Sequence, residues 1–131
     1  MHDLKDSARA LVRVTWNGLV HKTFRGKDAA ERFANEVRIL RYLESRGCDF
    51  VPVLKEVYPD ELRMVTTNCG ARVERLTEEK QRSLFAELEN FGVRHDDPFL
   101  RNITYRHSDG RFCLIDFELA TILNPEPESP A

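Results

Sequence analysis

The sequence predicts a small α+β domain in which antiparallel hairpins pack with two amphipathic helices. Three observations support this prediction. Apolar residues alternate on both sides of an Asn17-Gly18 turn, an apolar stripe with helical spacing runs through residues 29–45, and a polar loop followed by a hairpin lies between residues 92 and 118. With 131 residues the chain is long enough to bury one hydrophobic core.

The domain boundaries are predicted from the composition along the chain. Residues 1–10 are polar and are expected to be flexible, and residues 124–131 form an acidic, proline-rich tail that is expected to be disordered. Residues 11–123 are then a single domain. We expect a sheet-rich first part over residues 11–70 and a second part, with the polar loop, over residues 71–123.

The overall composition is that of an ordinary soluble globular protein, with 41% hydrophobic and 32% charged residues. The net charge of −2 gives no reason to expect a nucleic acid or an anionic membrane as partner. Apolar runs are too short to cross a membrane and the N-terminus has no signal-peptide character, so a cytoplasmic location is expected. The cysteines are widely spaced and are expected to be buried, reduced thiols: Cys48, Cys69 and Cys113.

Two hairpins are predicted in the first part. The segments 11–16 and 19–24 alternate around Asn17-Gly18, which is a strong hairpin turn. The segments 50–58 and 61–67 are rich in β-formers and flank Pro59-Asp60. Together they predict a four-stranded antiparallel sheet.

A helix is predicted between the two hairpins, from Ala29 to Ser45. Asp28 and Glu31 have the spacing of a capping box at its start, and Gly47 is placed to end it. Its apolar stripe is expected to pack on the sheet and consists of Phe33, Val37, Leu40 and Leu43.

The second part begins with a helix capped by Thr77 and ended by Gly92. Its apolar face is Leu84, Phe85, Leu88 and Phe91. A hairpin is expected next, with strands at residues 103–105 and 112–115 joined through Asp109-Gly110. Residues 119–123 are predicted to form either a strand or a helical turn.

Polar residues lie at both ends of this last hairpin. His95, Asp97 and Asn102 follow the order H-x-D-x-x-x-x-N before it, and Asp116 follows it in Ile-Asp-Phe-Glu. The hairpin should bring Asn102 and Asp116 to one edge. This arrangement resembles the catalytic loop and metal-binding loop of the protein-kinase-like phosphotransferases. The resemblance implies that Asp97 is the catalytic base, that Asn102 and Asp116 bind Mg²⁺, and that His95 supports the loop.

Two residues of the first part extend this resemblance. The strand around Lys22 is similar to the Val-Ala-Ile-Lys strand of kinases, whose lysine contacts the nucleotide phosphates. The helix sequence around Glu36 is similar to the kinase C helix, whose glutamate pairs with that lysine. Cys69 falls where kinases bind adenine through the segment between their lobes. The resemblance implies a minimal protein-kinase-like fold with a small N-terminal sheet, a C helix, one main helix and a catalytic-loop hairpin.

Three departures from the family pattern are visible. No Gly-x-Gly-x-x-Gly loop precedes Lys22, and the residues before Leu11 are expected to supply neither a strand nor a loop. Glu118 replaces the glycine of Asp-Phe-Gly, as in choline and ethanolamine kinases and their aminoglycoside phosphotransferase relatives; it is expected to be a third carboxylate near the metal or an exposed residue at a strand end. The short segment after Glu118 is expected to provide little acceptor surface, so a homodimer or a partner protein is expected to complete it.

The predicted function is an ATP-dependent phosphotransferase that uses Mg²⁺, with protein serine or threonine, or the protein itself, as acceptor. Arg94 and Arg101 are expected to add positive charge near the phosphates. Three alternatives stay open: a pseudokinase-type nucleotide-binding or regulatory module, a small-molecule kinase as indicated by Glu118, and an unrelated metal hydrolase that uses His95, Asp96 and Asp97. The last alternative gives Lys22 and Glu36 no role.

Overall fold

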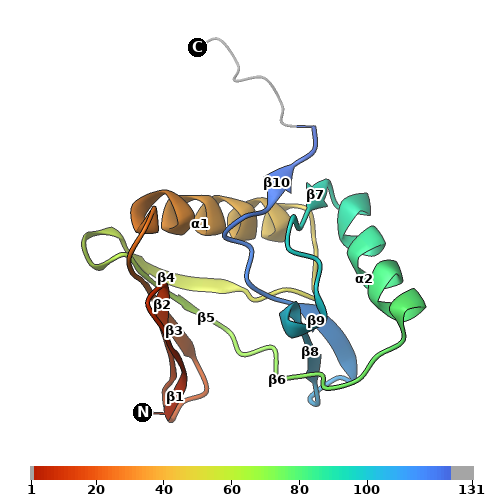
Figure 1. The fold of residues 1–131 in the computed structure, drawn as a ribbon, viewed down its shortest axis with the longest axis horizontal. Helices are drawn as coiled ribbons and strands as arrows, with labels where there is room; N and C mark the ends of the chain where they lie inside the picture. Colours follow the sequence, from red (N-terminus) through yellow and green to blue (C-terminus); the bar gives the residue numbers. More distant parts are fainter. Residues whose placement is uncertain (1, 125–131) are drawn as a thin grey trace.

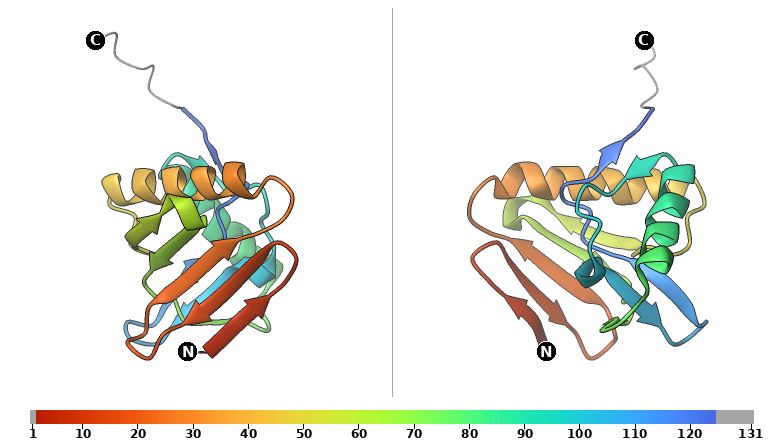
Figure 2. Two further views of the ribbon diagram at one scale, coloured as in Figure 1. Left: turned by 90° about the vertical axis from the view of Figure 1, so that its left-hand side faces the viewer. Right: turned by 45° about the vertical axis from the view of Figure 1, so that its right-hand side comes forward.

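The computed structural model describes residues 2–124 and has an α+β architecture of antiparallel sheets and two helices (Figure 1). The first part of the chain forms a five-stranded sheet with the strand order β1-β2-β3-β5-β4. Helix α1 (Ala29–Ser45) connects β3 to β4 and packs along the sheet (Figure 2). The strands are β1 (His2–Asp6), β2 (Ala10–Val14), β3 (Val20–Phe24), β4 (Leu54–Tyr58) and β5 (Arg63–Thr66).

Strand β1 shows that the prediction of a flexible segment at residues 1–10 is wrong. It pairs antiparallel with β2, and a short loop at residues 7–9 joins the two strands. In this loop the Ser7 N–H donates a hydrogen bond to the Ala10 carbonyl (2.9 Å). The pattern was too weak to indicate a strand because Leu4 is the single apolar residue of β1. The sheet therefore has one strand more than the sequence predicts.

Helix α1 has the predicted bounds, and its apolar stripe is buried against the sheet as expected. At its end the Gly47 N–H donates to the Glu44 carbonyl (3.0 Å) and the Cys48 N–H donates to the Leu43 carbonyl (3.0 Å). These two hydrogen bonds form a Schellman motif, in which carbonyls of the last turn find donors after the helix has ended. The predicted stop at Gly47 is confirmed.

The predicted capping box at the start of α1 is wrong. Asp28 has φ 57° and ψ 25°, and its side chain makes no capping hydrogen bond to any described residue. A side-chain cap requires extended backbone at this position, because only then does the carboxylate reach the free N–H groups of the first turn. The turn instead begins with the Ala29 N–H donating to the Gly26 carbonyl (3.3 Å).

The second part of the chain contains helix α2 (Glu78–Asn90) and short antiparallel strands. Thr77 caps α2 as predicted, since its hydroxyl accepts from the Lys80 N–H (3.1 Å). The predicted hairpin is present as β8 (Ile103–Arg106) and β9 (Arg111–Leu114), with β6 (Ala71–Arg72) added at its edge. Strand β7 (Val93–Arg94) pairs with β10 (Thr121–Ile122), which confirms the strand alternative for residues 119–123.

One cluster of buried apolar side chains connects the two parts of the chain. It includes Phe24 of β3, Leu40 of α1, Leu88 of α2 and Leu114 of β9. Helix α1 lies over the five-stranded sheet, whereas α2 lies beside the β8–β9 hairpin (Figure 1). The functional residues described below lie where the sheet, α1 and this hairpin meet.

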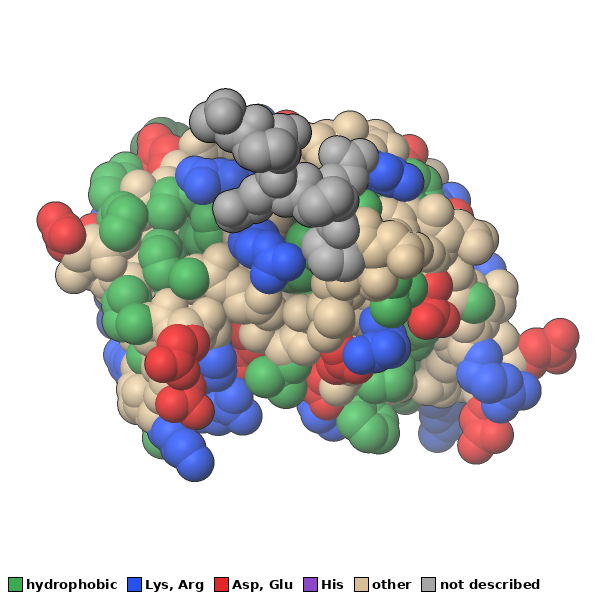
Figure 3. Space-filling model, turned by 90° about the horizontal axis from the view of Figure 1, so that it is seen from above, with side chains coloured by type: hydrophobic (Ala, Val, Ile, Leu, Met, Phe, Trp, Pro, Cys, Tyr) green, Lys and Arg blue, Asp and Glu red, His purple; other side chains and the backbone are tan. Residues whose placement is uncertain are grey.

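The surface has no simple charge pattern on the face drawn in Figure 3, where acidic and basic side chains are interspersed among apolar ones. Neither helix in the described part of the chain is long and apolar enough to cross a membrane. The expected tail at residues 124–131 lies outside the described residues, apart from Asn124.

Candidate active site

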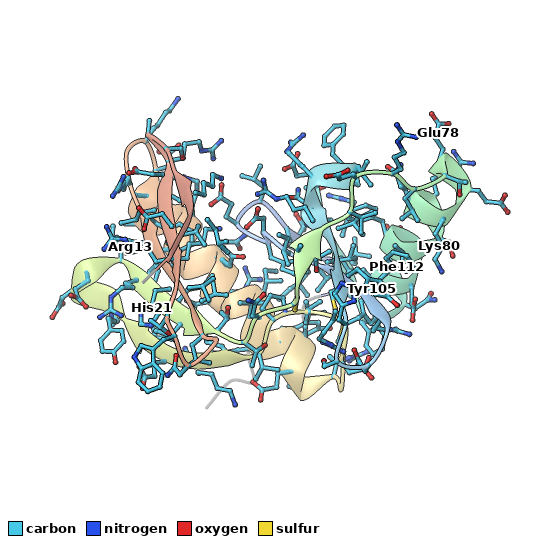
Figure 4. The ribbon with its side chains drawn as sticks, turned by 90° about the horizontal axis from the view of Figure 1, so that it is seen from below. Arg13, His21, Glu78, Lys80, Tyr105 and Phe112 are labelled. Carbon is cyan, nitrogen blue, oxygen red and sulfur yellow. The ribbon has the colours of Figure 1, made fainter. Side chains whose placement is uncertain are left out.

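A cavity of about 320 Å³ lies between the five-stranded sheet and the β8–β9 hairpin. Its apolar walls include Val12 of β2, Val20 of β3 and Met64 of β5, and charged side chains meet at one end. Side chains alternate across the sheet, so Val12 and Lys22 face the cavity while Arg13 and His21 lie together on the opposite face (Figure 4). The cavity is lined by Leu4, Lys5, Val12, Val20, Lys22, Glu36, Pro52, Met64, Thr66, Thr67, Asn68, Cys69, Gly70, Ala71, Arg72, Thr104, Ile115 and Asp116.

Lys22 and Glu36 form a buried ion pair at the charged end of this cavity. The Lys22 Nζ lies 2.7 Å from Glu36 Oε1, and the two residues are only 5% and 2% exposed. The second carboxylate oxygen of Glu36 accepts a hydrogen bond from the Phe117 N–H (2.7 Å). Glu36 therefore fixes the lysine of β3 and the backbone that follows Asp116 at the same time.

Asp116 completes this charged cluster. Its Oδ1 lies 3.4 Å from the Lys22 Nζ, and its φ of 62° is unusual for a residue other than glycine. Hydrogen bonds on both sides hold this conformation, because the Ile115 N–H donates to the Asn102 carbonyl (3.0 Å) and the Phe117 N–H donates to Glu36. The predicted hairpin thus places Asp116 beside the loop that contains Asn102.

The charges of this cluster shift one another's ionisation. Burial works to lower the pKa of Lys22, but the carboxylates of Glu36, Asp116 and Glu118 outweigh it and the pKa is raised. Burial also works to raise the pKa of Asp116, but the positive charges of Lys22, Lys5 and Arg72 outweigh it and the pKa is lowered. Lys22 is therefore an ammonium and Asp116 a carboxylate at neutral pH.

Asp97 and Asn102 lie in contact in the loop after α2. The Asn102 amide nitrogen donates to the Asp97 carbonyl (2.8 Å) and to Asp97 Oδ2 (2.9 Å). Arg101 pairs with the other carboxylate oxygen of Asp97 (2.6 Å), and Arg94 pairs with Asp96 (2.6 Å). Both arginines that were expected to serve phosphates are engaged by carboxylates of their own loop.

His95 lies in the core and is hydrogen-bonded to this loop. It is 2% exposed, its Nε2 donates to the Ile115 carbonyl (2.8 Å), and its Nδ1 accepts from the Asp97 N–H (3.2 Å). This pattern requires the neutral ring. Burial lowers the pKa of His95, although the Ile115 carbonyl and nearby carboxylates oppose the shift.

Glu118 is not an exposed strand end, because its side chain is 16% exposed and lies close to two arginines and to Lys22. It is paired with Arg9 of the β1–β2 loop (3.1 Å), with Arg32 of α1 (3.3 Å) and more distantly with Lys22 (3.5 Å). Beside it, the Asn35 amide donates to the carbonyls of Glu118 and Ala120, both at 3.0 Å. These contacts attach the segment after Asp116 to α1 and to the first loop of the sheet.

Cys69 lies at the apolar side of the cavity, in the segment that leads from β5 to β6. Its carbonyl accepts from the Thr104 hydroxyl (2.7 Å), which fixes this segment to β8. A Cβ at Gly70, which has φ 92°, would lie 2.0 Å from the Tyr105 carbonyl oxygen, so no other residue fits there. All three cysteines are buried free thiols, as expected, and burial raises the pKa of Cys48 to about 11.

The oxygen atoms near Asp116 suit a small hard cation such as Mg²⁺. The described residues contain no cluster of three or more His, Cys, Asp or Glu side chains arranged to hold a metal ion. Mg²⁺ usually binds through one or two protein oxygens together with waters and substrate phosphates, so it does not need such a cluster. Asn102 and Asp116 are the two residues here whose side-chain oxygens could serve as such ligands, and the amide nitrogen of Asn102 is held by Asp97.

Leu4, Lys5 and Arg72 are among the cavity residues that the sequence did not indicate. Leu4 and Lys5 come from β1, which was expected to be flexible, and Arg72 comes from the two-residue strand β6. Arg72 Nη2 lies 3.9 Å from Asp116 Oδ2. The periodicity of such short polar strands is too weak to recognise, so no signal in the sequence identifies these residues.

A family model described as the phosphotransferase enzyme family (APH) matches residues 54–126, which is more than half of the chain. The chain therefore belongs to this family, which is part of the protein-kinase-like superfamily. No curated protein matches the chain. The matched region includes Asp97, Asn102 and Asp116, whereas Lys22 and Glu36 precede it.

Proposed function

We propose that the protein is an ATP-dependent phosphotransferase with a minimal kinase-like fold and that it uses Mg²⁺. One observation carries the proposal: an ammonium, Lys22, is held by two carboxylates, Glu36 and Asp116, at the charged end of a cavity with apolar walls. Membership of a phosphotransferase family supports it. The order of sheet, α1, α2, polar loop and hairpin supports the kinase-like arrangement.

The apolar part of the cavity is the proposed site of the adenine ring. A volume of about 320 Å³ lies at the lower end of the range for small-molecule sites, which suits the base and ribose better than a whole nucleotide. Val12, Val20 and Met64 provide faces for the ring, and the backbone at Cys69 provides hydrogen-bonding groups at its edge. The phosphates then extend toward Lys22.

The charged end of the cavity is the proposed phosphate and metal site. Lys22 contacts phosphate oxygens, and Glu36 orients Lys22 through their ion pair. Asp116 and the side-chain oxygen of Asn102 are the proposed protein ligands of Mg²⁺. Bound there with ATP, Mg²⁺ would supply positive charge that offsets the charge of the phosphate oxygens.

Asp97 is the proposed catalytic base. It accepts the proton of an acceptor hydroxyl while the hydroxyl oxygen bonds to the γ-phosphorus and the bond from that phosphorus to the β–γ bridging oxygen breaks. Asn102 and Arg101 hold its two carboxylate oxygens in a fixed orientation. The proposed acceptor is a protein serine or threonine, the protein itself, or a small hydroxyl compound. We still predict that a partner protein or a second copy of this chain completes the surface that binds the acceptor.

The decisive experiment measures transfer from γ-labelled ATP with and without Mg²⁺, reading label on protein, label on added hydroxyl compounds, and free phosphate. Asp97→Asn and Asp116→Asn should each lower Mg²⁺-dependent turnover by about 10²-fold or more. The matched control is Asp60→Asn, because Asp60 is exposed in the 3₁₀ turn between β4 and β5.

The outcomes separate the candidate functions. Label on protein or on one class of small molecule identifies the acceptor and upholds the proposal. ATP binding without Mg²⁺-dependent turnover would contradict catalysis and favour a regulatory nucleotide-binding module. Turnover that survives both substitutions would place the chemistry elsewhere in the protein.

A further inference from the structure

Strand β1 contains an irregularity that changes which of its side chains face the cavity. Asp3 pairs with Arg13 of β2, but Lys5, two residues later, pairs with Val12, only one residue along. One extra residue, Leu4, is therefore accommodated in β1, which is the arrangement of a β-bulge.

This bulge turns Lys5 toward the cavity. Residues that lie opposite each other in an antiparallel pair share a face of the sheet. In regular pairing Leu4 would lie opposite Val12 and Lys5 opposite Leu11, whose side chain is on the other face of the sheet. With the bulge, Lys5 lies opposite Val12 instead, and both Leu4 and Lys5 line the cavity. Bulges next to active sites commonly redirect a side chain in this way.

A second cation reaches the same end of the cavity from the other side. Arg72 of β6 lines the cavity, its guanidinium lies 3.9 Å from Asp116, and its side chain is 52% exposed. Lys5 is also partly exposed. Both side chains can therefore move to meet a ligand that enters from solvent.

The cluster around Lys22 creates a need for these cations. Three carboxylates surround Lys22, those of Glu36 at 2.7 Å, Asp116 at 3.4 Å and Glu118 at 3.5 Å. Arg9 and Arg32 also pair with Glu118, so three cations and three carboxylates balance here and leave no net positive charge for a polyanion. Residues 1–17, which include the β1–β2 loop, contain no glycine, so these residues do not form a glycine-rich phosphate loop.

We infer that Lys5 and Arg72 form a phosphate-binding subsite that recognises the polyphosphate chain of the nucleotide. The subsite rests on the proposed function in that it assumes a nucleotide in the cavity. Lys5 contacts the chain from the sheet, Arg72 contacts it from the β6 side, and Leu4 covers the apolar part of the ligand. Side-chain cations thus take the place of backbone amides in binding phosphate.

The test measures binding of ATP, adenosine and inorganic tripolyphosphate by titration calorimetry in the presence of Mg²⁺. Lys5→Met and Arg72→Met should each weaken ATP and tripolyphosphate about tenfold, as expected for loss of one contact to a charged group. Both variants should leave adenosine binding unchanged. Lys5→Arg, which keeps the positive charge, should bind ATP as well as the unmodified protein does. In each of the Lys5→Met and Arg72→Met variants, the affinity for ATP should depend less strongly on salt concentration than it does in the unmodified protein.

Matched controls are Lys55→Met on β4 and Arg75→Met after β6, because both side chains are exposed and neither lines the cavity. Equal loss of ATP and adenosine in the Lys5 and Arg72 variants would overturn the subsite and indicate a structural role. Unchanged ATP binding in both variants would overturn it as well.

The design distinguishes this inference from the proposed function. If the unmodified protein binds ATP and tripolyphosphate but shows no turnover, the subsite stands and phosphotransfer fails. If ATP is turned over while Lys5→Met and Arg72→Met bind it normally, the function stands and the subsite fails. If the unmodified protein binds neither ATP nor tripolyphosphate, both fail.

Discussion

The ion pair of Lys22 with Glu36 and the ion pair of Arg101 with Asp97 have nearly the same length, 2.7 and 2.6 Å, but their surroundings differ. The first pair has side chains that are 7% and 3% exposed, and it joins β3 to α1. The second has side chains that are 58% and 24% exposed, and its partners are four residues apart in one loop. Length alone therefore says little about the importance of either pair.

The comparison shows how burial sets the consequence of breaking an ion pair. Removing one partner of a buried pair leaves an uncompensated charge in a medium of low polarity, whereas water replaces the lost partner of an exposed pair. The Lys22 pair should therefore control stability as well as function. The Arg101 pair should influence the orientation of Asp97 and little else.

The largest effect is expected for Lys22→Met, which should lower the free energy of unfolding by about 3–5 kcal/mol because Glu36 is left buried without its partner. Urea denaturation measures this loss. The control is Lys27→Met, where the lysine is exposed and its backbone carbonyl, which accepts from Arg32, is retained. Similar losses in the two variants would mean that burial does not distinguish these lysines.

A double substitution sharpens the same comparison. Adding Glu36→Gln to Lys22→Met removes the uncompensated charge, and the glutamine oxygen can still accept from the Phe117 N–H. Stability should recover in part while phosphotransfer stays absent. Recovery of transfer together with stability would contradict the role proposed for Lys22.

A smaller effect is expected for Glu118→Gln, about 1–3 kcal/mol, because the nearly buried Arg32 guanidinium loses its carboxylate. Arg32 retains hydrogen bonds to the carbonyls of Arg25 and Lys27, which limits the loss. Urea denaturation of Glu118→Gln tests this expectation. The control is Glu44→Gln, because Glu44 is an exposed glutamate of α1, the helix that contains Arg32. An unfolding free energy equal to that of the control would show that the Glu118 contacts contribute nothing.

The pH dependence of stability should reveal the neutral, buried His95. Because burial lowers its pKa below the ordinary value of 6.5, the unfolded chain binds more protons than the folded protein just below that pH. The contribution of His95 is complete above pH 6.5 and is lost as the pH falls toward the pKa of the folded state. Denaturation curves measured from about pH 8 to about pH 5 span the ordinary histidine pKa. Over this range the free energy of unfolding should decrease less steeply for His95→Gln than for His107→Gln, which is an exposed control. Equal slopes would exclude this role.

The smallest effect is expected for Arg101→Met, less than about 1 kcal/mol in the free energy of unfolding, because the pair with Asp97 is exposed. Turnover should change more than stability, since Arg101 holds a carboxylate oxygen of the proposed base. A large loss of stability would mean that the loop depends on this pair more than its exposure implies.

Local patterns in the sequence were sufficient for much of the fold. The bounds of α1, the Asn17-Gly18 hairpin and the Thr77 cap depend on residues within a few positions of one another, so the sequence predicts them directly. Residues of the candidate site could also be predicted where they follow the order of the kinase-like motifs along the chain. The contact of Lys22 with Glu36 is of this kind.

Features that depend on distant contacts could not be predicted. Strand β1 has one apolar residue and is stabilised by pairing with β2, so its own sequence does not indicate it. The left-handed backbone of Asp28 depends on the turn between β3 and α1, and a capping pattern alone suggested the opposite. The partners of Glu118 come from Arg9 and Arg32, which are far from it in the sequence and become its neighbours only in the fold.

Asn35 has a mechanical consequence for the site. Its amide group bridges the carbonyls of Glu118 and Ala120, and the carboxylate of the next residue of the same helix, Glu36, accepts a hydrogen bond from the Phe117 N–H. Rotation of α1 about its axis must therefore break these hydrogen bonds or carry residues 117–120 with it. Helix α1 and residues 117–120 are therefore mechanically coupled. A force applied to the exposed side of the helix is transmitted to the backbone next to Asp116 and so to its carboxylate in the cavity.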